Sequence, residues 1–104
     1  ILWHASFVYK LRENELIRTP SNVVEIERCV ADKDVLHIFE KCLKHLDYSG
    51  PCNIDYKLLD NGLLKILEIN PRLGGSLMRG DSGDLLKGAL TCIVNNAERS
   101  VQAI

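Results

Sequence analysis

The order of apolar and polar residues divides the chain into strand-like and helix-like stretches. From Leu2 to Lys10 the sequence is rich in Trp, Phe, Val and Tyr, which favours a β-strand. A short apolar run from Leu16 to Thr19 follows the polar stretch LRENE and predicts a second strand, joined to the first by a turn. Pro20 ends this unit. Residues Asn22 to Cys29 alternate loosely, which is compatible with a third strand or an irregular sheet edge.

The period becomes helical after Asp32. Val35, Phe39, Cys42, Leu43 and Leu46 recur on one side at helical spacing, with polar residues on the other side. Asp32 or Asp34 can cap the first amides of this helix, and Gly50 can supply the left-handed residue after it. A second amphipathic helix is predicted near the end of the chain. Asp81 or Ser82 can cap it, and its apolar positions are Leu86, Ala89, Leu90, Ile93, Val94 and Ala97.

Two further strands, CNIDYKLLD and LLKILEIN, are separated by Asn61-Gly62, a strong hairpin signal. A two-residue turn there places Asp55 opposite Glu68, Asn53 opposite Asn70 and Tyr56 opposite Leu67. A three-residue turn would break this register, because a slip of one residue moves a side chain to the other face.

With the two-residue turn, one face of the hairpin is apolar and the other is polar. The apolar face consists of Ile54, Tyr56, Leu58, Leu67 and Ile69, and the polar face of Asn53, Asp55, Lys57, Glu68 and Asn70. We therefore expect an α+β fold: a mainly antiparallel sheet with two helices packed on one face.

Composition limits the classes of function. The 104 residues suffice for one domain, residues 1–104, and the 13 basic and 14 acidic residues form no long run that would attract nucleic acid or a membrane. No apolar stretch approaches the ~20 residues that span a bilayer. The four cysteines form no CxxC pair, which indicates reduced thiols and a cytoplasmic location. The first residue, Ile1, already begins a strand-like run, so we expect a piece of a longer protein.

The polar face of the hairpin carries the candidate chemistry. At an effective dielectric near 20, two opposed carboxylates ~5 Å apart repel by about 3 kcal/mol. Mg²⁺ would relieve the repulsion between Asp55 and Glu68, since it binds one or two carboxylates and keeps waters or phosphate oxygens. Asn70 offers a further oxygen from the same face. Alternatively, Lys57 or solvent alone relieves the repulsion on an ordinary exposed sheet face.

The loop after the hairpin adds groups suited to phosphate. Pro71 cannot donate to a sheet ladder and ends the pairing beside the candidate ligands. Arg72 offers a planar guanidinium for phosphate or carboxylate oxygens. Gly74 and Gly75 let backbone amides approach a ligand, and Ser76 adds a hydroxyl group. Together with the carboxylates, this loop indicates the edge of a phosphate-binding site.

The stretch GPCNIDYKLLDNGLLKILEINPRLGGS, Gly50 to Ser76, resembles the metal-binding end of the ATP-grasp superfamily of carboxylate–amine ligases, in particular its carbamoyl-phosphate synthetase-like members. The resemblance identifies the chain as a C-terminal lobe fragment. It implies that Asp55, Glu68 and Asn70 hold Mg²⁺ or Mn²⁺ on the phosphates of ATP. It further implies that Arg72 steadies a phosphate or acyl phosphate as a catalytic residue, and that Gly74, Gly75 and Ser76 line the substrate loop.

In this family ATP phosphorylates a carboxylate and an amine attacks the resulting acyl phosphate, so the implied partners are ATP, a small carboxylic acid and an amine. The chain has no GxGxxG and no Walker pattern. We therefore expect the parent protein to be a ligase and the isolated chain to be inactive and to self-associate through uncovered surface. The alternative is a non-catalytic ATP-grasp-like binding or association module.

Overall fold

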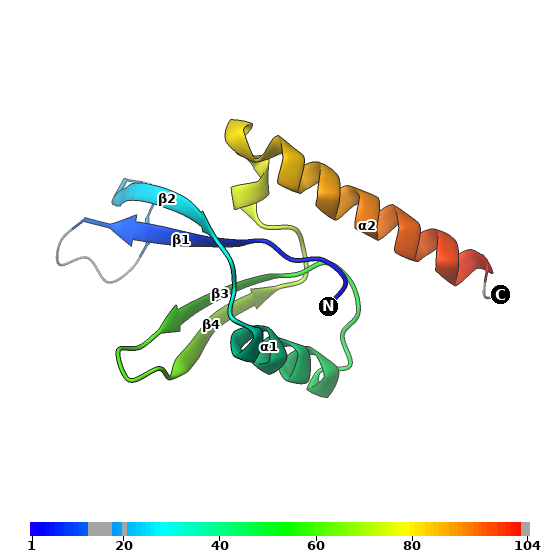
Figure 1. The fold of residues 1–104 in the computed structure, drawn as a ribbon, viewed down its shortest axis with the longest axis horizontal. Coiled ribbons are helices and arrows are strands. Elements are labelled where there is room, and N and C mark those ends of the chain that lie inside the picture. The colour runs from blue at the N-terminus through cyan, green and yellow to red at the C-terminus, as the bar shows by residue number, and fades with distance from the viewer. Residues whose placement is uncertain (13–17, 20, 103–104) are drawn as a thin grey trace.

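The computed structural model describes residues 1–12, 18–19 and 21–102. Over these residues the fold is α+β, with two short hairpins and two helices (Figure 1). Its elements are β1 (Ser6–Leu11), β2 (Val23–Cys29), α1 (Lys33–His45), β3 (Asn53–Leu58), β4 (Leu64–Asn70), the 3₁₀ turns η1 (Gly75–Met78) and η2 (Gly80–Ser82), and α2 (Gly83–Gln102).

The strands of the described residues form two separate antiparallel sheets, β1–β2 and β3–β4. The expected single sheet with both helices on one face is therefore wrong. β1 begins at Ser6 rather than Leu2 and pairs with β2, so that Lys10 lies opposite Glu25. The stretch Asn22 to Cys29 thus contains a true strand, which gives β1 a longer partner than the run from Leu16 to Thr19 could. Residues 16–17 of that run lie outside the described residues, and Arg18 and Thr19 belong to no strand.

The turn between β3 and β4 takes three residues instead of the predicted two. The Leu59 amide donates to the Leu63 carbonyl at 2.8 Å, and the Gly62 amide donates to the Leu59 carbonyl at 2.9 Å. Gly62 has a φ of 82°, in the left-handed region that glycine adopts without a steric penalty. The loop is thus of the common three-residue hairpin type, in which a tight turn is followed by a residue in the left-handed conformation.

A bulge in β4 then restores the predicted pairing beyond it. Tyr56 lies opposite Ile66, whereas Asp55 lies opposite Glu68, so Leu67 is the extra residue. The predicted pairs of Asp55 with Glu68 and of Asn53 with Asn70 are thereby confirmed, although the predicted turn is wrong. Leu67 is 58% exposed and does not join the apolar face, because the bulge gives its place opposite Tyr56 to Ile66.

Helix α1 begins at the predicted cap. The Asp32 carboxylate accepts a hydrogen bond of 2.7 Å from the Asp34 amide. After the helix, the first left-handed residue is Asp47, with a φ of 52°, rather than Gly50. Phe39 of α1 packs edge-on against Tyr56 of β3 with ring centroids 5.0 Å apart, and this contact joins α1 to the second hairpin.

Helix α2 lies on the other side of the N-terminal segment from α1 (Figure 1). It packs closely against that segment: a Cβ atom at Gly88 would lie 2.8 Å from the indole nitrogen of Trp3. The predicted cap at Ser82 does not form, because the buried Ser82 hydroxyl has no hydrogen-bond partner among the described residues.

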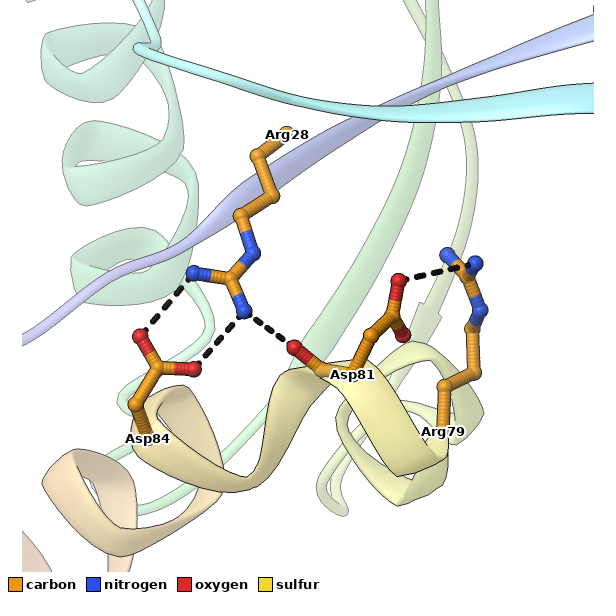
Figure 2. A network of polar contacts seen from close by, with 4 residues as sticks. All are labelled: Arg28, Arg79, Asp81 and Asp84. Carbon is orange, nitrogen blue, oxygen red and sulfur yellow. Dashed lines mark hydrogen bonds and ion pairs between the residues drawn. The ribbon is translucent and has the colours of Figure 1, made fainter.

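An arginine of β2 ties the first hairpin to the start of α2 (Figure 2). The Arg28 guanidinium donates to both carboxylate oxygens of Asp84, at 2.9 and 2.7 Å, and to the Asp81 carbonyl at 2.5 Å. Arg79 pairs with the Asp81 carboxylate at 3.3 Å. The hydrogen bonds from Arg28 hold the pKa of Asp84 below its ordinary value.

The core of the described chain is small. Its buried apolar side chains are those of Ala31, Val35, Phe39, Leu77 and Ala89. The molecule is elongated, with extents of 53 × 32 × 20 Å. Neither helix, over the residues described, has the length and apolar character needed to cross a membrane.

Candidate functional site

Asp55 and Glu68 are brought together on one face of the second hairpin. They are cross-strand partners next to the bulge, and opposed residues in an antiparallel pair share a face. Glu68 is exposed and the Asp55 side chain keeps 29% of its surface, so neither carboxylate is sealed in the core. Asn70, two positions after Glu68, lies on the same face and is half-buried. The three predicted ligands therefore occupy one side of the hairpin.

Asn53 connects this acidic pair to the glycine loop. Its amide nitrogen donates to a carboxylate oxygen of Asp55 at 3.3 Å. Its amide oxygen faces Gly74 so closely that a Cβ atom there would lie only 2.2 Å away. Gly74 is therefore required by this close approach to Asn53, whereas a Cβ atom at Gly75 would meet nothing within 4 Å.

A second wall of the site comes from the first hairpin and the segment that joins its strands. The Arg18 guanidinium pairs with Asp55 at 3.4 Å and lies over the ring of Tyr9, 4.2 Å from its centroid. The Tyr9 hydroxyl is hydrogen-bonded to the hydroxyl of Ser76. Ser76 thus contacts β1, and a permanent positive charge already lies beside Asp55.

The segment after β4 turns back at once. The Arg72 amide donates to the Asn70 carbonyl at 2.8 Å, and the Arg72 guanidinium donates to the Leu73 carbonyl at 3.1 Å. Arg72 is exposed and forms no ion pair among the described residues. Within that part of the chain, the side chains of Glu68 and Asn70 also make no hydrogen bond or ion pair. These three side chains are available to a ligand.

One cavity of about 900 Å³ connects all of these groups. Its lining includes the predicted residues Asp55, Glu68, Asn70, Arg72, Gly74, Gly75 and Ser76, together with Tyr9, Arg18 and Asn53. Side chains of the N-terminal segment and of both helices also line it, among them Trp3, Phe39 and Ile93. The space is large enough for a nucleotide-sized or drug-sized ligand.

The donor set decides which metals fit. No three His, Cys, Asp or Glu side chains of the described residues gather into a metal-binding group. Two carboxylates and an amide oxygen suit a hard cation such as Mg²⁺ or Mn²⁺, which retains waters or phosphate oxygens. They do not suit a structural zinc ion, which takes four protein ligands with nitrogen or sulfur among them.

Comparisons of the chain with protein-family models, with curated proteins and with solved structures find no match in any of the three. The resemblance to the ATP-grasp superfamily therefore depends on the residues between Gly50 and Ser76 alone.

Three residues of the site were missed by sequence reasoning. Asn53 had a usable signal, because it lies opposite Asn70 and two positions before Asp55 on the polar face. Tyr9 and Arg18 had none: their approach to Ser76 and Asp55 depends on the placement of one hairpin against the other. Local periodicity carries no information about that placement.

Proposed function

We propose that this chain supplies the magnesium and ATP-phosphate end of an ATP-grasp carboxylate–amine ligase. The observation that carries the proposal is the cross-strand pair of Asp55 and Glu68, with Asn70 on the same face. An opposed carboxylate pair on an exposed sheet face is unfavourable. Arg18 and the Asn53 amide offset the charge of Asp55 in this structure, whereas a divalent cation would neutralise both carboxylates at once.

In this proposal Asp55, Glu68 and Asn70 hold Mg²⁺ or Mn²⁺ on the phosphate oxygens of ATP. The metal would supply charge neutralisation at the phosphates. The γ-phosphoryl group of ATP would pass to a substrate carboxylate with release of ADP, and an amine would then displace phosphate from the acyl phosphate. Arg72 is the catalytic residue: its guanidinium leaves the Leu73 carbonyl and binds the transferred phosphoryl group. Gly74, which packs against Asn53, fixes the start of the substrate loop.

Turnover of ATP needs more than this chain offers. The sequence has no GxGxxG and no Walker pattern, and the residues of the candidate site are ligands for metal and phosphate. We therefore propose that the parent protein is a cytoplasmic ligase and that the isolated chain binds the metal without hydrolysing ATP.

Broadening of amide resonances by Mn²⁺ tests the metal site, because a paramagnetic ion reports weak binding and its position at once. We expect the signals of Asp55, Glu68 and Asn70 to broaden first, and Glu68→Gln to remove the effect while leaving the spectrum folded. Asp60→Asn, a carboxylate loss at the exposed tip of the same hairpin, is the matched control and should change nothing. Unchanged broadening in Glu68→Gln, or broadening centred elsewhere, would refute the assignment.

A non-catalytic association module is the second candidate, and the extensive exposed apolar surface favours it. The two candidates separate in one experiment on the longer parent protein. A ligase gives ADP and phosphate that depend on an acid and an amine and are lost in Glu68→Gln. An association module gives no ATP turnover, either without substitution or as Glu68→Gln.

A further inference from the structure

The open side of α2 carries a continuous apolar stripe. Leu86, Leu90 and Val94 follow one another at four-residue spacing, which places them on one side of the helix. Leu90 is 47% exposed and Val94 is 54% exposed, and a shallow groove of about 430 Å³ runs along them. On the other side of the same helix Ala89 is buried and Gly88 lies against Trp3. The helix thus packs one face inside the molecule and leaves an apolar face outside.

The amount of exposed surface leaves room for a partner. The chain exposes 8081 Å², about 2,200 Å² more than the roughly 5,900 Å² expected for a compact monomer of 11.7 kDa. A stable protein interface covers only about 800 Å² of each partner. The excess is therefore ample for an interface of ordinary size.

The charges beside the stripe indicate which occupant fits. Lys87 and Glu98 are both exposed and lie on the same flank of the stripe, because eleven residues are close to three full helical turns. When two identical helices pair antiparallel about a two-fold axis, equivalent flanks meet. Lys87 of one copy then lies beside Glu98 of the second copy, and the same pair forms again at the other end of the stripe.

We propose that α2 is a homodimerisation surface, on which the α2 helix of a second copy packs antiparallel. Leu90 lies against Val94 of the second copy, and Leu86 lies against Ala97 of the second copy. Two symmetric Lys87–Glu98 pairs flank this apolar seam and set its direction. A parallel arrangement would lose the pairs, because opposite flanks then meet.

A membrane surface does not fit the same stripe. Helices that lie on anionic membranes carry several Lys or Arg residues along the polar face next to the apolar one. Here the flank carries one lysine and one glutamate, with Thr91 and Asn95 between them. Balanced charges favour a protein surface of the same composition over a lipid headgroup layer.

Sedimentation equilibrium of the 104-residue chain over a wide concentration range tests the proposal, with circular dichroism to check folding. We expect a monomer–dimer equilibrium that Leu90→Asp abolishes. Val8→Asp places the same charge on another exposed apolar residue, in β1, and should leave the dimer intact. A monomer at every concentration, or equal loss of dimer in both variants, would overturn the proposal.

A charge exchange identifies the second copy as the partner and fixes the helix direction. Lys87→Glu and Glu98→Lys should each weaken dimerisation about tenfold, since each replaces two attractive pairs with two repulsive ones. The double variant carrying both changes should recover the dimer affinity of the chain without substitutions. Loss in both single variants without recovery in the double variant would contradict the antiparallel arrangement. None of these residues belongs to the candidate metal site, so the outcome is independent of the proposed ligase function.

Discussion

At the scale of single residues, the candidate site depends on a few side chains that hold one another in place. Asn53 is the central one, because its amide binds Asp55 with one end and meets Gly74 with the other. Its place opposite Asn70 in the hairpin fixes this geometry. The glycine loop and the acidic pair are thereby coupled through one amide group.

Gly74→Ala tests this coupling. The new Cβ atom would lie 2.2 Å from the Asn53 oxygen and 3.0 Å from its Cγ atom, so the amide must move. We expect a loss of about 1–3 kcal/mol in the free energy of unfolding, the usual cost of overpacking, measured by urea denaturation. Gly75→Ala, where nothing lies within 4 Å of the new Cβ atom, is the control, and its free energy of unfolding should stay near that of the chain without substitutions. Equal stability of both variants would show that the close approach is not constraining.

Arg18 competes with any cation at Asp55. Its guanidinium lies 3.4 Å from the carboxylate and is held over Tyr9. We expect Arg18→Gln to tighten Mn²⁺ binding about fivefold, since an exposed ion pair is worth up to ~1 kcal/mol. Arg12→Gln removes the same charge from another exposed arginine and controls for the net charge of the chain. Weaker binding in Arg18→Gln would mean that the arginine assists the metal instead, through phosphate or through the fold.

At the scale of elements, the local pattern of apolar and polar residues predicts most of the secondary structure. The helices, the second hairpin and the pairing of Asp55 with Glu68 all follow from periodicity and from the Asn61-Gly62 signal. The turn takes one residue more than the predicted two, which was considered only as a case that would break the register. The bulge at Leu67, which cancels that extra residue, was not predicted. Each depends on a small difference in backbone energy that the apolar pattern alone does not report, because Leu67 and Ile66 are both apolar.

The bulge assigns opposite environments to these two neighbours. Ile66 lies opposite Tyr56, which packs on Phe39, whereas Leu67 is 58% exposed. We expect Ile66→Ala to cost about 2 kcal/mol and Leu67→Ala less than about 0.5 kcal/mol in urea denaturation. The order without the bulge would be the reverse, so a larger loss in Leu67→Ala would contradict the register described here.

At the scale of the whole molecule, a few contacts between elements hold an open arrangement together. Arg28 joins β2 to α2, Phe39 joins α1 to β3, and Trp3 joins the N-terminal segment to α2. All three connect residues far apart in the sequence. The sequence pattern predicts which faces are apolar, but it does not say which apolar face meets which. For that reason one sheet was expected where the described residues form two.

The thiols of Cys29 and Cys52 and the phenol of Tyr56 link the stability of the folded chain to pH on the alkaline side. Burial raises the pKa of Cys29 and Cys52 above 9.0, and burial, helped by the nearby Cys29, raises the pKa of Tyr56 above 10.0 although the Ser6 hydroxyl opposes it. A raised pKa in the folded state favours the neutral form, so these groups contribute their full stabilisation below the ordinary values. That contribution is lost as the pH rises from the ordinary values through the raised pKa values of the folded chain, because the unfolded chain ionises first.

We therefore expect the free energy of unfolding, measured by urea denaturation from neutral pH to about pH 10 and beyond, to fall on the alkaline side. Tyr56→Phe should flatten the upper part of this decline. A pH profile that is flat above pH 9.0 would show that these groups are as well hydrated in the folded chain as in the unfolded one.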